Sequence, residues 1–299
     1  MKYLAKLFLQ LVLKLSAASF FLVLVACGSD KATTPASTST ELTLANCTTS
    51  VANDVPEFYK KYFKCSTITI SAGKVVIESD GLPPHKSAYY GVGHPNYTTF
   101  DTTAGKRQNP NTISTQTIHL EFPLTPVSRG LTINGTLVDG TQGNNANEFA
   151  MGIVGVGLDG VSIYNALAAP PDLIADEANT FDSYSAHADV GGTYHYHSTT
   201  PGPLEVMQSL GLTTSTTPES ADIELYGIMC DGTVVMGCTE LNGSAVGAAA
   251  LDSQNGHVHD LMDAASVGLS NRYHVHVCPG SYAHDYTPEI QYYNSCVSN

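Results

Sequence analysis

The chain of 299 residues is long enough for one large domain or two modest ones, and its 42% apolar content with only 13% charged residues can build a hydrophobic core. These values exclude a disordered tail. Thirteen Lys and Arg against 27 Asp and Glu give a formal net charge of -14, and so acidic a chain repels a phosphate backbone. We therefore expect no nucleic-acid partner.

The N-terminal segment has the pattern of an export signal. Three lysines are scattered through a run rich in Leu, Val and Phe, which ends in Leu-Val-Ala directly before Cys27. A charged start, a short apolar stretch and small residues before a cleavage point are typical of a secretory signal peptide. The ending resembles the lipobox of bacterial lipoproteins, which implies that Cys27 is lipidated and becomes the mature N-terminus. An ordinary signal peptide with an incidental Cys is the alternative.

This pattern sets the expected domain boundaries and the expected location. We assign residues 1–26 to the signal peptide, the Ser/Thr/Ala-rich residues 27–44 to a flexible tether and residues 45–299 to the folded domain. The acyl anchor on Cys27 would attach the domain to a lipid bilayer of the bacterial cell envelope. Gly28 and Ser29, with no Asp after the Cys, favour the outer membrane, facing the periplasm or the cell surface.

Six cysteines follow in the expected domain, and an even number in an exported protein favours disulfides over thiolate metal sites. Six cysteines permit 15 connectivities. Pairing of sequence neighbours would join Cys47 to Cys65, Cys230 to Cys238 and Cys278 to Cys296. The alternative is that one pair stays reduced or binds metal, although no Cys-x-x-Cys occurs.

Strand signals outnumber helix signals along the domain. Ile118, Leu120 and Phe122 alternate with polar residues, which predicts a strand with one buried face. Three dipeptides favour tight turns, Asn134-Gly135, Asp159-Gly160 and Asp231-Gly232, and the last two predict hairpins over residues 153–164 and 225–236. Only residues 204–210 and 245–251 have the pattern of short helices. We expect a mainly β fold with long loops and a few short helices.

An internal repeat divides the domain into units of about residues 150–203 and 222–281. Asp182 and His187 recur 70 positions later as Asp252 and His257, and the Asp-Gly turns are 72 positions apart. The segment 194–197, Tyr-His-Tyr-His, recurs 79 positions later as Tyr-His-Val-His. This agreement in order and spacing predicts a single domain built on a tandem repeat. It leaves open whether the two halves share one site or hold two.

Histidines two positions apart are unusually frequent. Three such pairs occur, where random placement of 11 His among 299 residues gives about 0.4: His195/His197, His257/His259 and His274/His276. Alternate residues of a strand project from the same face, so both imidazoles of a pair can reach one cation. Neutral imidazole suits zinc, copper, nickel or iron. The expected cofactor is a transition metal ion, copper or zinc.

Nine side chains are candidate members of the metal site. The expected core ligands are His187, His195, His197, His257, His274 and His276, with His259, Asp182 and Asp252 as possible members. Each Asp could bind the ion, could orient a ligating imidazole, or could serve only as a turn residue. The Tyr residues between the histidines face the opposite side of the strand, so we expect them to pack rather than to bind metal.

The tetrapeptide at residues 194–197 also resembles the signature of the YHYH-domain family. Other family-like features follow in order at residues 80–85 (Asp-Gly-Leu-Pro-Pro-His), 109–111 (Asn-Pro-Asn), 157–164, 182–187, 227–232 and 251–276. The resemblance covers about residues 80 to 280. It implies an exported domain built around a histidine motif.

Three functions remain open at this point. The first is a non-catalytic metal-binding lipoprotein that buffers or senses copper or zinc. The second is a metal-dependent enzyme acting on an envelope substrate, because His-x-His ligands with an adjacent Asp can hold a catalytic cation. The third is a structural surface lipoprotein whose histidines are hydrogen-bonded core residues. The sequence contains no Gly-rich phosphate loop, Gly-x-Ser-x-Gly or His-Glu-x-x-His motif, which argues against nucleotide enzymes and common hydrolases.

Overall fold

The computed structural model describes residues 40–141, 143, 145–247, 251–279, 285–294 and 296–298. The predicted signal peptide, the predicted lipidation site at Cys27 and most of the predicted tether lie outside the described residues. The end of that tether is described. The backbone N–H of Leu42 donates to the side-chain oxygen of Asn96 at 2.8 Å, and the Asn96 amide donates back to the Leu42 carbonyl at 2.8 Å. The chain is therefore already attached to the folded part at Leu42.

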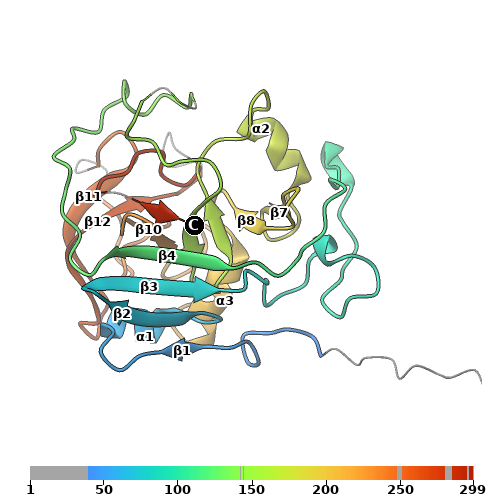
Figure 1. The fold of residues 1–299 in the computed structure, drawn as a ribbon, viewed down its shortest axis with the longest axis horizontal. Coiled ribbons are helices and arrows are strands. Elements are labelled where there is room, and N and C mark those ends of the chain that lie inside the picture. Colours follow the sequence, from blue (N-terminus) through green and yellow to red (C-terminus); the bar gives the residue numbers. More distant parts are fainter. Residues whose placement is uncertain are drawn as a thin grey trace, which may run out of the picture. The chain divides into compact units, whose positions relative to one another are not determined.

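Two sheets form the framework, as Figure 1 shows. The five-stranded sheet has the order β1 (Ser50–Val51), β2 (Thr67–Ser71), β3 (Lys74–Ser79), β4 (Ile118–Pro123) and β13 (Val297–Ser298). The eight-stranded sheet has the order β11 (Gly256–Met262), β12 (Gly268–His276), β10 (Val234–Met236), β9 (Leu225–Met229), β5 (Ile153–Gly157), β6 (Ser162–Tyr164), β8 (Tyr194–Tyr196) and β7 (Ala186–Ala188).

Helices are short, and the predicted mainly β fold is confirmed. The helices are α1 (Glu57–Tyr62), α2 (Ile174–Glu177) and α3 (Pro201–Ser209), with 3-10 turns at Ala88–Tyr90, Thr103–Gly105 and Ala178–Thr180. The α3 helix begins where Thr200 accepts a hydrogen bond from the Gly202 N–H and where Pro201 suits the first helical position. It includes most of the predicted helix at 204–210. Residues 245–247 are not helical, and residues 248–250 lie outside the described part.

One hydrophobic core joins the two sheets. Along β4, Ile118, Leu120 and Phe122 are buried and alternate with partly exposed residues, as the period of two predicted. These side chains belong to the same buried cluster as Val156 in β5 and Ile228 in β9. By contrast, Asn134-Gly135 makes a turn inside the long loop between β4 and β5 and joins no hairpin.

The eight-stranded sheet consists of two equivalent halves. From its two edges the order is β7-β8-β6-β5 and β11-β12-β10-β9, so β5 and β9 meet at the centre as antiparallel neighbours. There Val156 lies opposite Ile228, its own equivalent 72 positions later. A residue paired with its own equivalent marks a local two-fold axis. In both halves the edge hairpin is antiparallel, and its inner strand runs parallel to the next strand.

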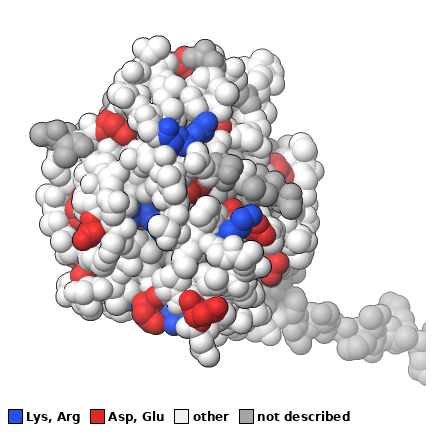
Figure 2. Space-filling model, turned by 60° about the vertical axis from the view of Figure 1, so that its left-hand side comes forward, with Lys and Arg blue, Asp and Glu red and all other residues white. Residues whose placement is uncertain are grey.

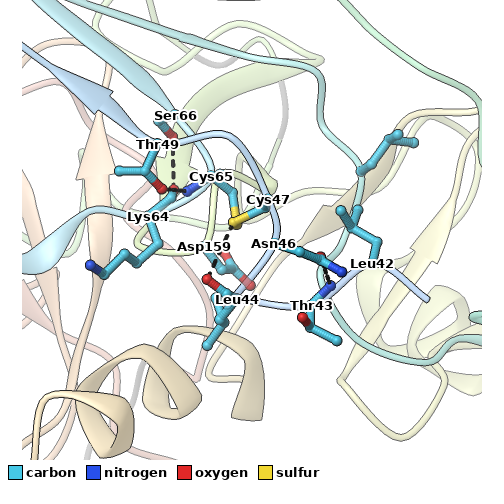
Figure 3. The surroundings of a disulfide bond; sticks show 12 residues. Leu42, Thr43, Leu44, Asn46, Cys47, Thr49, Lys64, Cys65, Ser66 and Asp159 are labelled. Atoms are coloured by element: carbon cyan, nitrogen blue, oxygen red, sulfur yellow. Dashed lines mark hydrogen bonds between the residues drawn. A yellow bond between two sulfur atoms is a disulfide. The ribbon is translucent and has the colours of Figure 1, made fainter. Parts of the chain in front are cut away.

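Three disulfides crosslink the described residues, and the neighbour pairing holds for one of them. Cys47 and Cys65 are joined (Figure 3), and the Cys65 N–H donates to the Thr49 hydroxyl at 2.8 Å beside the bridge. The other two expected pairings are wrong: the bridges are Cys230–Cys296 and Cys238–Cys278. Cys230 directly follows β9 at the turn of its hairpin, whereas Cys238 lies past the other end of β10. The length of the hairpin separates the two neighbours.

The surface carries few charges. On the face in Figure 2, acidic and basic side chains are dispersed among uncharged ones, as the 13% charged content leads one to expect. Among the described residues, no helix combines the length and the apolar character that crossing a membrane requires.

Candidate metal centres

Three imidazoles meet where the edge hairpin of β7 and β8 places them. His187 in β7 is paired in register with His195 in β8, and His197 follows directly after β8. The Nε2 atoms of His187 and His195 are 2.9 Å apart, and those of His195 and His197 are 3.1 Å apart. All three residues are buried. We call His187, His195 and His197 the first histidine site.

Backbone carbonyls fix the proton position on two of these rings. The Nδ1 of His195 lies 2.9 Å from the Thr193 carbonyl oxygen, and the Nδ1 of His197 lies 2.8 Å from the Asn165 carbonyl oxygen. A carbonyl oxygen can only accept, so each Nδ1 must carry the proton. The Nε2 of each neutral ring is then a free electron-pair donor.

The third ring is fixed by a side chain. The Nδ1 of His187 lies 2.6 Å from the Thr180 hydroxyl oxygen, and that hydroxyl donates its own proton to the Glu177 carbonyl at 2.7 Å. Thr180 therefore accepts from the His187 Nδ1–H. The consequence is that three Nε2 lone pairs converge, which is the arrangement that a metal ion requires.

Burial keeps these rings neutral. It lowers the pKa of His187 to about 3 and the pKa of His197 to about 4. The pKa of His195 lies well below its ordinary value because of burial and the two neighbouring rings. Near neutral pH the site therefore presents nitrogen donors rather than three positive charges.

A carboxylate and a pocket lie beside the first histidine site. Glu177, the last residue of α2, has Oε1 3.4 Å from the His187 Nε2, while its Oε2 is buried without a hydrogen-bond partner. Burial, together with the negative charge of Asp172, raises the pKa of Glu177. The three rings and Glu177 are among the residues that line a pocket of about 440 Å³.

The other half of the sheet holds a second cluster, on β11 and β12. His257 is paired in register with His274, and the Nε2 of His257 is 3.1 Å from the Nε2 of His276. Glu240 lies at the centre of this cluster, with carboxylate oxygens 3.2 to 3.5 Å from the Nε2 atoms of His257, His259, His274 and His276. We call Glu240 and these four histidines the second histidine site.

The second site repeats the ring orientation of the first. The Nδ1 of His274 lies 3.0 Å from the Arg272 carbonyl, and the Nδ1 of His276 lies 2.8 Å from the Gly237 carbonyl. Burial by itself would raise the pKa of Glu240, but the surrounding imidazoles outweigh it and hold that pKa far below its ordinary value. Glu240 is therefore a carboxylate and a negative donor among the rings.

Residues 108–246 match the model of the family described as YHYH protein. The chain therefore contains a YHYH domain at these residues. The match is narrower than the expected 80 to 280: it contains the first histidine site and Glu240, and it ends before β11. The searches of curated proteins and of solved structures found no match.

The YHYH segment and its repeat thus place the predicted histidines in two clusters rather than in one. Within each of two sets, all potential ligand atoms lie within 4.8 Å of one another. One set is His187, His195 and His197, and the other is Glu240, His257, His259 and His274. His276 lies beside the second set. Four strands separate β8 from β12, so at about 4.8 Å per step the two sites are on the order of 20 Å apart.

The two candidate aspartates do not reach either cluster. Asp182 accepts from the hydroxyls of Tyr194 and Ser87 at 2.9 and 2.5 Å, and Asp252 accepts from the Tyr273 hydroxyl at 2.8 Å. These carboxylates have a structural role instead, because each accepts a hydrogen bond from the first Tyr of its motif. In the first half, Tyr196 similarly donates to Asp159 at 2.7 Å. The tyrosines between the histidines therefore anchor the strand from its opposite face.

The Asn-Pro-Asn segment supports the YHYH motif from the edge of the sheet. The side-chain amides of Asn109 and Asn111 donate to the Ala188 carbonyl at 3.0 and 2.9 Å. They satisfy the exposed edge of β7 next to His187. The sequence alone does not predict this contact with the histidine strand.

The remaining histidines are in separate places. His119 on β4 lies between Glu78 and Glu121, whereas His85 is buried and stacks on Tyr184 with ring centroids 3.5 Å apart. His284 lies outside the described residues. A third group of possible ligands is purely acidic, Asp139, Glu148 and Glu289, and the carboxylate of Glu289 accepts from a loop amide at Gly140.

Sequence reasoning missed three residues: Glu177, Thr180 and Glu240. Each comes from a loop or short helix outside the repeated strands. Glu240 has Ala168 at its equivalent position 72 residues earlier, so the repeat carries no signal for it. Only the folded chain brings these side chains to the histidines.

Proposed function

We propose that this protein is an exported, lipid-anchored metal-binding protein that holds two transition metal ions, one at each histidine site. Its anchor is the acyl group on Cys27, and its location is the bacterial outer membrane. The proposal rests on one observation above all: at the first histidine site, three Nε2 atoms face one another while every Nδ1 is committed to an oxygen acceptor.

The physical argument concerns lone pairs. Neutral rings that point their Nε2 lone pairs at each other across about 3 Å repel, and burial makes such repulsion stronger because the local dielectric is low. A divalent cation at the meeting point converts the repulsion into three bonds. Reading the cluster as a plain hydrogen-bonded core would leave these acceptors without donors, which is costly in a buried site.

The donor set favours copper or zinc. Imidazole nitrogen binds both ions well, and the order of divalent affinities peaks at copper. The six cysteines of the domain are joined in disulfides, so their sulfurs do not compete as thiolate ligands. The carboxylate of Glu240 adds a hard oxygen donor to the second site only.

Elemental analysis of the full chain, purified without a His tag and dialysed, tests the proposal. We expect close to two copper or zinc ions per chain, and a melting temperature that rises when the metal-free protein is reloaded, since an ion bound only to the folded state stabilises it. A metal-free protein whose melting temperature ignores both ions would overturn the proposal. Replacing Cys27 by Ser should release the protein from the membrane fraction.

A metal-dependent enzyme remains a second candidate, favoured by a feature of the first histidine site alone. Catalytic zinc sites combine three protein ligands with a position for water or substrate, and here three imidazoles border a pocket of about 440 Å³. Metal-dependent hydrolysis of an activated ester that is lost in His195→Ala and retained in His274→Ala would favour this candidate. Equal rates with and without metal would speak against it.

A further inference from the structure

The pocket beside the first histidine site is lined by two kinds of side chain. The polar and charged ones include the three imidazoles, Glu177 and Asp189, and the apolar ones include Met151, Leu167, Ala169 and Val190. Its volume of about 440 Å³ falls in the range of small-molecule sites, which also combine apolar walls with a few polar groups. The pocket is therefore large enough for more than an ion and its water.

Two of the apolar side chains are exposed to an unusual degree. Val190, in the turn between β7 and β8, is 97% exposed, and Met151, just before β5, is 39% exposed. Apolar side chains contributed by separate segments around one pocket mark a binding surface more often than a bare protein surface.

The second histidine site differs in its donors rather than in its apolar lining. Its pocket, of about 410 Å³, also has apolar side chains, among them Leu241, Leu261 and Met262, but Glu240 lies against all four imidazoles there. Its ion already has a carboxylate donor from the chain. A ligand that combines an oxygen donor with an apolar body would therefore fit the first site and gain little at the second.

We propose that the pocket of the first histidine site binds a small organic carboxylate with an alkyl or aryl body. This inference rests on the proposed function, because the carboxylate binds the ion held by the three imidazoles. The apolar body lies against Met151, Leu167 and Val190. Three neutral imidazoles leave the charge of the ion compensated only by Glu177, which lies 3.4 Å from the Nε2 of His187, so the ion still attracts an anionic head group. Burial of the apolar body supplies affinity in proportion to its length.

The test uses the full chain loaded with zinc and a series of acetate, butanoate and hexanoate, with binding followed by calorimetry. Full burial of one methylene group raises affinity about fourfold, so the four methylene groups that hexanoate adds to acetate allow a gain of up to about 250-fold. With partial burial we expect a gain of at least about 10-fold. The double variant Met151→Ser with Val190→Ser should reduce this gain and leave the affinity for acetate and the zinc content unchanged.

A matched control keeps the result specific. The double variant Val92→Ser with Val127→Ser also removes two exposed apolar side chains, 88% and 64% exposed, which do not line this pocket, and it should retain the full dependence on chain length. Equal affinities for all three acids, or an identical loss in both double variants, would overturn the inference. Zinc content measured on the same samples separates this failure from failure of the metal site itself, since the metal site stands if two ions are present.

Discussion

The two halves of the eight-stranded sheet share a framework and differ in what they hold. Both halves contain an edge hairpin, a parallel neighbouring strand and a central strand. Backbone carbonyls orient the rings of His195 and His197 in the first half, and carbonyls at equivalent positions orient those of His274 and His276 in the second half. The Asp that anchors the first Tyr also recurs. Equivalent residues are His187 and His257, His195 and His274, His197 and His276, Asp182 and Asp252, and Tyr194 and Tyr273.

The differences lie at the ends of the strands and in the loops. Asp189 in the first half accepts from the Tyr164 hydroxyl at 2.6 Å, and Tyr164 stacks on His195 with centroids 3.6 Å apart. The equivalent positions in the second half hold His259, a further potential ligand, and Met236. Each half also takes its carboxylate from a different segment, Glu177 from the end of α2 and Glu240 from the loop after β10. The comparison teaches that the shared strand positions fix where an ion sits. Single exchanges on the strands, such as Asp189 for His259, and side chains from the connecting segments fix the number and charge of its donors.

The largest expected effect is the loss of one ion without the other. Replacing His195 and His197 by Ala removes two of three ligands at the first site, so this variant should keep about one ion per chain. Replacing His274 and His276 by Ala should do the same at the second site, because the sites are on the order of 20 Å apart. Elemental analysis of both variants measures the outcome.

Two controls guard this experiment against misfolding. The single variants His195→Gln and His274→Gln keep more of the side-chain volume and a hydrogen-bonding group, and near-ultraviolet circular dichroism reports whether the core is intact. If either well-folded double variant loses both ions, the halves do not bind independently and the comparison fails.

The carboxylates should separate the two halves next. Glu240 contacts four imidazoles, whereas Glu177 contacts His187 alone. We expect Glu240→Gln to weaken ion binding at the second site by about 10- to 100-fold, a range typical of residues that tune a metal site. Glu177→Gln should weaken the first site by less than about 10-fold.

Competition with a chromophoric chelator measures both affinities, and each variant serves as the control for the other. A larger loss from Glu177→Gln than from Glu240→Gln would show that the first site depends on its carboxylate more than the second, which contradicts the prediction.

How much of this could be read from the sequence differs between strands and loops. The alternation of Ile118, Leu120 and Phe122 and the Asp-Gly turns predicted their strands and hairpins, because both signals are local. The histidine spacing predicted which rings share a face. The repeat predicted two similar halves but not that they would form two sites, since that depends on which strands meet at the centre of the sheet.

Contacts between segments that are far apart in the chain could not be predicted from the sequence. Cys238 bonds to Cys278 rather than to Cys230 because the hairpin keeps Cys230 at its other end. Asp182 and Asp252 recur together with the histidines in the sequence repeat, which makes them candidate ligands. In the folded chain they instead accept hydrogen bonds from the hydroxyls of Tyr194 and Tyr273. Glu240 had no repeated counterpart to reveal it.

The first half contacts a buried histidine outside its metal site, His85, which should make the free energy of unfolding depend on pH. The Nε2 of His85 lies 3.3 Å from the Tyr196 hydroxyl, and the second half has Val275 at that position. Burial lowers the pKa of His85 to about 3, although the hydrogen bond to the Lys86 carbonyl raises it somewhat. As the pH falls below the ordinary histidine pKa of about 6.5, only the unfolded state takes up the proton, so stability is lost.

Between pH 7 and pH 5 this loss amounts to about 2 kcal/mol for one buried histidine. The free energy of unfolding of the metal-free chain should therefore fall by about 2 kcal/mol more than that of His85→Gln over this interval. Asp159 acts in the opposite sense, since burial raises its pKa to about 6, but both proteins keep it and the subtraction removes it. From pH 7 to pH 8.5 the two curves should run parallel, and parallel curves down to pH 5 would contradict the prediction.

A further expected effect concerns His187, the ring of the first site that a side chain orients. Thr180 accepts from the Nδ1–H of His187, a role that backbone carbonyls perform for His195 and His197. In Thr180→Val the shape is kept and the acceptor is lost, so the proton on His187 can move to Nε2 and block that donor. We expect ion affinity at the first site to fall about 10-fold, as for other residues that orient a ligating His. Thr180→Ser, which keeps the hydroxyl, should bind with nearly the original affinity, and the second site should be unaffected in both variants. An unchanged affinity in Thr180→Val would mean that the ion itself selects the tautomer of His187, and the difference in how the two halves orient their rings would then have no consequence for binding.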